Sequence, residues 1–193
     1  MKQDYLLELM RAKNSVFTTS DVALLWGEPD VQFVRKKLYR YLKAKKLYSL
    51  RRGIYAKAKE YDTLELATKI FTPAYISFET VLAKAGVIFQ FYGQIFVASY
   101  LTREITVNGQ AFAFRKIRNT ILTNQVGLVV KDTYCIASPE RAFLDILYLH
   151  KDYYFDHLDN LDWNKVLAIL PIYGGNKRMS RLIQKYRTAA EKA

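Results

Sequence analysis

The chain has 193 residues, is 51% hydrophobic and carries a formal net charge of +12. This apolar content can form a buried core and excludes general disorder. No apolar run reaches the roughly 18–20 residues that span a bilayer, and the first residues lack the apolar centre of a signal peptide, so we expect a cytoplasmic protein with no membrane partner. The single cysteine, Cys135, excludes a disulfide or a thiolate metal cage within one chain, and we expect it to be buried in a strand.

The positive charge is concentrated at the two ends of the chain. Residues 1–60 carry a net charge of +8, residues 61–175 carry −1 and residues 176–193 carry +5. Residues 31–59 contain eleven Lys or Arg and no Asp or Glu. Such a local imbalance is typical of proteins that bind nucleic acids. We therefore expect a basic binding domain at residues 1–60 and a second domain at residues 61–193.

Three helices are predicted at the beginning of the chain. The first covers residues 2–13, where apolar residues recur at helical spacing. A short second helix contains residues 22–26, with Thr19 or Ser20 as its N-cap and Gly27 at its end. Asp30 caps a third helix that continues to residue 46, because its carboxylate meets the positive end of the helix dipole.

The third helix is predicted to have two chemically different faces. Its apolar face should pack on the first two helices and consists of Val31, Val34, Leu38, Tyr41 and Leu42. Its polar face consists of Gln32, Arg35, Lys36, Tyr39 and Lys43. An amide, several cations and a tyrosine on one solvent-facing surface can contact both base edges and phosphates in a major groove. We predict DNA binding by this face; the alternative is a solvated basic surface without a ligand.

The residues after the third helix alternate around Gly53 and predict a hairpin. We expect strands at residues 47–50 and 53–56, with Arg51 and Arg52 at the turn. The order of helices followed by a hairpin predicts a winged helix-turn-helix. In such a domain, arginines at the tip of the wing lie against the DNA backbone or the minor groove.

The second domain is predicted to be α+β, with a largely antiparallel sheet of four or five strands and covering helices. Helices should begin at Asp62 or Thr63 and at Ser77. Strand-like runs then follow from residue 94 to residue 137, and Asn108 begins an Asn-Gly hairpin turn. Lys116 and Arg118 are interpreted as solvated edge charges, with nucleic-acid contact as the alternative.

The rest of the second domain contains acidic residues that need weighing as catalytic groups. Ser138 should cap a helix in which Glu140 lies in the first turn and Asp145 is a structural hydrogen-bond acceptor. The Asp residues between 152 and 162 lie near His157, but their spacing is not that of a calcium loop, so we expect a solvated loop. A basic helix at residues 176–189 could contact phosphates or an acidic partner, or be a charged chain end. The chain has no recognisable catalytic motif, and we expect no enzyme activity, no cofactor and no metal.

Three segments resemble the AbiEi-type antitoxins, which are transcriptional regulators of type IV toxin–antitoxin and abortive-infection systems. They are LRRGIYA at the end of the hairpin, AYISFETVLAKAG, and IASPERAFLDILY, which is similar to a helix start found in that family. The segment NKRMSRLIQKY is also similar to the last helix of short members.

The resemblance implies a repressor that binds inverted repeats in double-stranded DNA at its own promoter. It also implies that the second domain counters a cognate nucleotidyltransferase toxin without forming a stable complex, and it leaves a homodimer open. One alternative is a stand-alone regulator whose second domain dimerises or senses a ligand. The other is a metal-dependent enzyme that processes nucleic acids with Asp145, Glu140 or the acids between residues 152 and 162.

Overall fold

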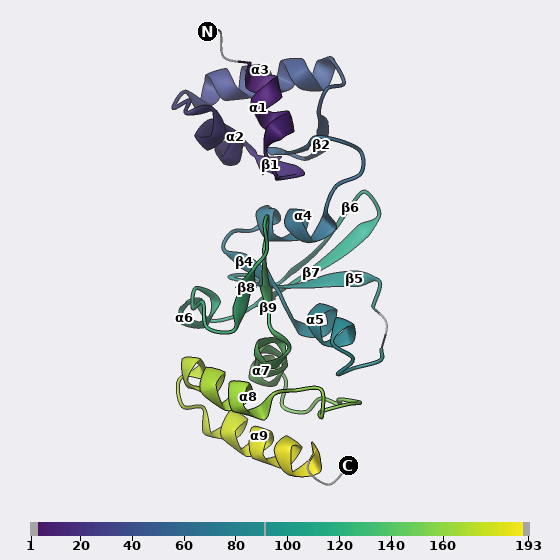
Figure 1. Ribbon diagram of the computed structural model, residues 1–193, viewed down its shortest axis with the longest axis vertical. Helices are drawn as coiled ribbons and strands as arrows, with labels where there is room; N and C mark the ends of the chain where they lie inside the picture. Colours follow the sequence, from purple (N-terminus) through teal and green to yellow (C-terminus); the bar gives the residue numbers. More distant parts are fainter. Residues whose placement is uncertain (1–3, 91, 191–193) are drawn as a thin grey trace.

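The computed structural model describes residues 4–90 and 92–190 (Figure 1). Its first unit contains α1 (Tyr5–Arg11), β1 (Val16–Thr18), α2 (Thr19–Trp26), α3 (Val31–Lys43), β2 (Tyr48–Arg51) and β3 (Ile54–Ala56). The three strands form an antiparallel sheet in the order β1-β3-β2. The predicted hairpin is therefore present as β2 and β3, whereas the sequence did not predict β1.

Local side-chain contacts explain where the helices of the first unit begin and end. The N-cap of α2 is Thr18 and not Thr19 or Ser20; Thr18 and Asp21 form a reciprocal capping box. Gly27 ends α2 in the left-handed conformation at φ 61°. The side chain of Asp30 accepts hydrogen bonds from the first amides of α3, as expected. The helix predicted over residues 2–13 is Tyr5–Arg11; residues 2 and 3 lie outside the described part of the chain.

The first unit has a small apolar core of its own. It consists of Leu9, Phe17, Val22, Trp26, Val34, Leu38 and Leu47. Two predicted inward positions of α3 are fully buried, whereas Tyr41 and Leu42 are half-buried. Val31 is 43% exposed, contrary to the prediction, because it is the first residue of the helix and lies beyond the packed part of the bundle.

The second region, which begins after β3, contains both helices and strands. Its elements are α4 (Thr63–Ile70), β4 (Ala74–Ile76), α5 (Phe78–Lys84), β5 (Gln94–Ser99), β6 (Arg103–Val107), β7 (Gln110–Lys116), α6 (Asn119–Leu122), β8 (Leu128–Val130), β9 (Cys135–Ala137), α7 (Pro139–Leu149), α8 (Trp163–Ile169), the 3-10 helix η1 (Leu170–Tyr173) and α9 (Lys177–Ala190). The chain is therefore α+β, as predicted. Cys135 lies in a strand as expected, but it is only half-buried.

The large sheet is mixed, with three antiparallel and two parallel pairings among six strands, so the prediction of a largely antiparallel sheet of four or five strands was only partly right. Its six strands have the order β6-β7-β5-β4-β9-β8. The Asn108–Gly109 hairpin joins β6 and β7 as expected, but β7 inserts between β5 and β6 and therefore runs parallel to β5. β4 is likewise parallel to β9. Alternating residues reveal a strand but not its neighbour, which explains the error.

Both faces of the large sheet are covered, and the layers follow one another along the long axis of the molecule (Figure 1). α4 lies on the face towards the first unit, where Phe71 contacts Phe114 of β7 at 4.8 Å between ring centroids. α5 and α7 lie on the other face, where Glu79 of α5 forms an ion pair with Arg115 of β7. α8 and α9 are stacked beyond α7, so α1 and α9 lie at opposite ends of the molecule.

The last helix is attached to α7 through a basic side chain. The guanidinium group of Arg178 donates hydrogen bonds to the carbonyls of Leu147, Tyr148 and His150, at the C-terminal end of α7. These carbonyls have no partner within the helix, so Arg178 caps it. One cation of the predicted basic helix is therefore structural.

Among the described helices, none is both long and apolar enough to cross a membrane.

Candidate nucleic-acid interface

The outward face of α3 presents the five residues predicted to bind DNA. Gln32, Arg35, Lys36, Tyr39 and Lys43 are all exposed, and Tyr39 is 59% exposed. The ammonium of Lys43 lies 5.5 Å from the centroid of the Tyr39 ring, which holds the two side chains together. The amide, the phenol and the cations of this surface therefore all face solvent on one helix.

The cations of α3 are not neutralised by neighbouring acids. Within residues 4–90 and 92–190, no carboxylate forms an ion pair with a Lys or Arg of α3. Asp30, which begins the helix, accepts hydrogen bonds from the amides of Gln32 at 2.8 Å and Phe33 at 3.2 Å. Lys37 is directed inward along the helix, where its ammonium lies 5.2 Å from the Tyr5 ring. The outer cations remain available to bind an anionic partner.

The two arginines of the hairpin are in different environments. Arg52 is exposed in the turn, as predicted for the tip of a wing. Arg51 is the last residue of β2 and is half-buried, with its guanidinium carbon 5.7 Å from the centroid of the Phe71 ring at the end of α4. Arg51 therefore contacts the second region, and Arg52 is the arginine with the freer access to a ligand.

A third cation of the basic segment has a structural contact. The ammonium of Lys57 donates hydrogen bonds to the carbonyls of Met10 and Ala12, at the C-terminal end of α1. Burial lowers the pKa of Lys57, and the nearby Glu65 carboxylate opposes this change. Part of the positive charge that the sequence shows as one continuous run thus stabilises the first unit.

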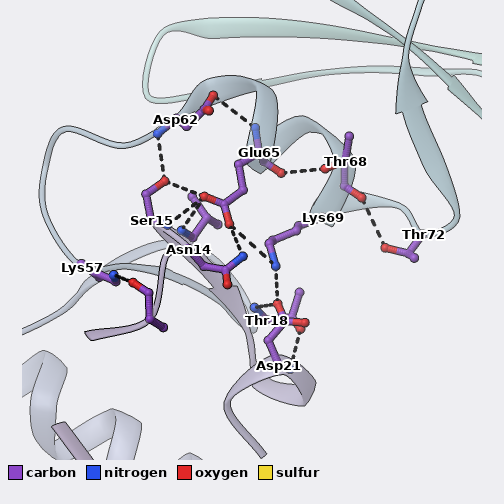
Figure 2. Close-up of polar contacts among 12 residues, drawn as sticks. Asn14, Ser15, Thr18, Asp21, Lys57, Asp62, Glu65, Thr68, Lys69 and Thr72 are labelled. Atoms are coloured by element: carbon purple, nitrogen blue, oxygen red, sulfur yellow. Dashed lines mark hydrogen bonds and ion pairs between the residues drawn. The ribbon is translucent and has the colours of Figure 1, made fainter. Parts of the chain in front are cut away.

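A buried carboxylate connects the first unit to the second region. Figure 2 shows Glu65 of α4 directed at the segment between α1 and β1. Its side chain has 0% exposure. It accepts hydrogen bonds from the side-chain amide of Asn14 at 2.7 Å, from the backbone amide and hydroxyl of Ser15 at 2.8 and 2.7 Å, and from the amide of Val16 at 3.2 Å. Charged hydrogen bonds of this kind fix geometry strongly.

Lys69 extends this junction to the start of α2 (Figure 2). Its ammonium lies 2.7 Å from a carboxylate oxygen of Asp21 and 3.9 Å from one of Glu65. Asp21 also accepts the Thr18 amide in the capping box of α2. The hydroxyl of Ser15 completes the network because it accepts the amide of Asp62, the N-cap of α4. The orientation of the first unit is therefore fixed by polar contacts at both α2 and β1.

Sequence reasoning missed this junction. Apolar contacts accompany the polar ones: Val16 and Ile54, both in the sheet of the first unit, belong to the buried core of the second region. No pattern around Glu65 or around Ser15 indicates that these two segments meet, since the two residues are 50 positions apart in the chain.

The acidic residues considered for catalysis are engaged in the fold. Asp145 has 0% exposure and accepts hydrogen bonds from the hydroxyls of Tyr75, Ser77 and Tyr173 at 2.9, 2.7 and 2.7 Å. Arg141, also fully buried, lies 3.5 Å from it. Burial raises the pKa of Asp145, against the opposing effects of Arg141 and the three hydroxyls. This supports the interpretation of Asp145 as a structural acceptor.

The same cluster corrects the predicted role of Ser77. It stands at the N-cap position of α5, but its side chain makes no capping hydrogen bond and donates to Asp145 instead. Of the acids between residues 152 and 162, Asp156 accepts the Phe89 amide and Asp162 caps α8. Among the described residues there is no group of three or more His, Cys, Asp or Glu that could hold a metal ion.

Neither a scan against protein-family models nor a search of curated proteins found a match to this chain. The relation to the AbiEi-type antitoxins therefore remains a prediction from the sequence motifs.

Proposed function

We propose that the first unit is a winged helix-turn-helix that binds double-stranded DNA, and that the protein is a transcriptional regulator. The observation that carries this proposal is the outward face of α3, which combines Gln32, Tyr39 and cations that form no ion pair with any described residue. The order of the elements, with β2 and β3 as a short wing next to β1, supports it. The lysines and Arg35 would bind phosphates, whereas Gln32 and Tyr39 would contact base edges.

The test measures binding of the full chain to duplex DNA from the region upstream of its own gene, by fluorescence anisotropy at several salt concentrations. Counterion release predicts that Lys36→Ala/Lys43→Ala weakens binding to every duplex and reduces the slope of log affinity against log salt by about 2. Gln32→Ala should instead reduce the preference for one sequence over another, by about 1–3 kcal/mol.

A matched control removes two charges from the second region. Lys84 and Lys151 are exposed and lie on α5 and beyond the end of α7. Lys84→Ala/Lys151→Ala should leave the salt slope unchanged. If the α3 variant and this control behave alike, α3 is not the DNA-binding element. Arg52→Ala tests the wing in the same assay, and an unchanged affinity would remove the wing from the interface.

We further propose that the protein acts as the antitoxin of a type IV system, repressing its own promoter and countering a nucleotidyltransferase toxin. This part rests on the sequence resemblance alone. Co-expression with a nucleotidyltransferase encoded beside this gene should restore growth without a stable complex, and the α3 variants should still restore it, because they alter only DNA binding. If no variant of the chain protects, the protein is a regulator without a toxin partner.

A further inference from the structure

A cavity in the second region, outside the α3 surface, has the lining of an anion site. It lies where β5 and β7 end and α7 passes, and its volume is about 500 Å³. Its lining residues are Tyr100, Lys116, Ile117, Arg118, Asn119 and Tyr148. This volume is within the roughly 300–1,000 Å³ that small-molecule sites occupy.

The charge of the lining favours an anion. Lys116 and Arg118 are both exposed, and in the described part of the chain neither forms an ion pair. The neighbouring Arg115 is already neutralised, because its guanidinium donates to both carboxylate oxygens of Glu79 at 3.0 and 2.9 Å. Four other cavities among the described residues, with volumes of about 310 to 580 Å³, are each lined by at least one acidic residue, whereas this one has none.

The rest of the lining is aromatic and apolar. Tyr100 is 45% exposed, and its ring is supported edge-on by Phe71 at 6.4 Å between centroids. Tyr148 is half-buried and lies 5.7 Å from Tyr173, measured between ring centroids. Ile117, at 1% exposure, forms an apolar base. Tyrosine rings of this kind provide flat surfaces on which a nucleobase can stack.

We propose that this cavity binds a nucleoside phosphate. Lys116 and Arg118 hold the phosphate by charged hydrogen bonds, and Tyr100 and Tyr148 contact the base. The same chemistry is offered by a free mononucleotide and by a nucleotide unit of a single strand. The site does not depend on duplex binding by α3, since it involves different residues on the other unit.

Isothermal titration calorimetry of the full chain tests the proposal. The ligands are AMP, inorganic phosphate and a short single-stranded oligonucleotide. Lys116→Ala/Arg118→Ala should weaken binding of the nucleotide at least about tenfold, because both phosphate contacts are lost. Tyr100→Ala should weaken the nucleotide on the order of tenfold but leave inorganic phosphate unchanged, because only the base stacks on the ring. Circular dichroism confirms that each variant is folded.

The ligands used in the titration distinguish a free mononucleotide from a nucleotide unit of a single strand. Binding of AMP that the variants weaken identifies a free nucleotide, and binding of the oligonucleotide alone, weakened by the same variants, identifies a strand. The control is Lys84→Ala/Lys151→Ala, which removes the same charge from other parts of the second region. It should change neither the affinity for AMP nor the affinity for the oligonucleotide. The proposal is overturned if no nucleotide or oligonucleotide binds, or if the Lys116/Arg118 variant and the control have equal affinities.

Discussion

Two buried carboxylates, Glu65 and Asp145, stabilise different parts of this structure. Both have 0% exposure. Asp145 lies inside the second region, where three hydroxyls and Arg141 surround it. Glu65 accepts its hydrogen bonds from the first unit, and its nearest cation, Lys69, is 3.9 Å away. Asp145 therefore maintains the packing of the second region, and Glu65 maintains the placement of the first unit relative to the second region.

Removal of Asp145 should have the largest effect on stability. Asp145→Ala leaves Arg141 buried without its partner and three hydroxyls without an acceptor. Breaking a buried pair from one side costs about 3–5 kcal/mol, so the variant should unfold at much lower denaturant concentration. Chemical denaturation followed by circular dichroism measures the loss.

A double substitution separates the charge from the packing. In Asp145→Leu/Arg141→Met neither partner is left charged. The loss of stability should therefore be smaller than the sum of the losses measured for Asp145→Leu and Arg141→Met alone. Additive losses would show that the two side chains are not coupled, and the comparison with Glu65 would then fail.

Substitution of Glu65 should have an intermediate effect that is concentrated at the junction. Glu65→Gln removes the charge and replaces one accepting oxygen by an NH2 group, which must then face donors: the Asn14 amide on one side or those of Ser15 and Val16 on the other. Hydrogen bonds to a charged group contribute about 1.5–3 kcal/mol, and we expect a loss in this range. Hydrogen exchange at the amides of Ser15 and Val16 should accelerate, while exchange in the large sheet stays slow.

The control for this prediction is Glu104→Gln, the same chemical change at an exposed position on β6. It should affect neither stability nor exchange. If Glu65→Gln slows or preserves exchange at both amides, the carboxylate does not fix the two parts together.

Lys69 should contribute least among the residues of the junction. Its side chain is 15% exposed and that of its partner Asp21 is 37% exposed, so water screens the pair. Lys69→Met should cost about 1 kcal/mol in thermal or chemical denaturation. Lys165→Met breaks the more exposed pair with Asp162 and serves as the reference, expected within about 0.5 kcal/mol of the unchanged protein. A larger loss at Lys165 than at Lys69 would contradict this order.

Local features of the fold could be predicted from the sequence because their causes are local. The caps Asp30 and Ser138, the helix end at Gly27 and the Asn108 hairpin all depend on neighbouring residues. The exposed face of α3 followed from helical periodicity for the same reason.

Features that depend on distant partners could not be predicted. The parallel pairing of β5 with β7, the hydrogen bond from Ser77 to Asp145 and the contact of Arg51 with Phe71 each join segments whose own patterns are uninformative about the partner. The cavity next to Lys116 likewise needs Tyr100 and Tyr148, which come from separate elements. Periodicity indicates which side of an element is buried, but not against what.

The pairing of β4 with β9 has a consequence for folding during synthesis. Ile76 lies opposite Ile136, so the centre of the large sheet stays incomplete until the ribosome has made the residues of β9. The sheet of the first unit is complete once β3 has emerged, since β1 and β2 are both earlier in the chain. A nascent chain would therefore present the basic helix while Val16 and Ile54 still lack their apolar neighbours. Such a chain exposes apolar surface that is prone to aggregation, and this surface is buried only when the rest of the chain has been synthesised.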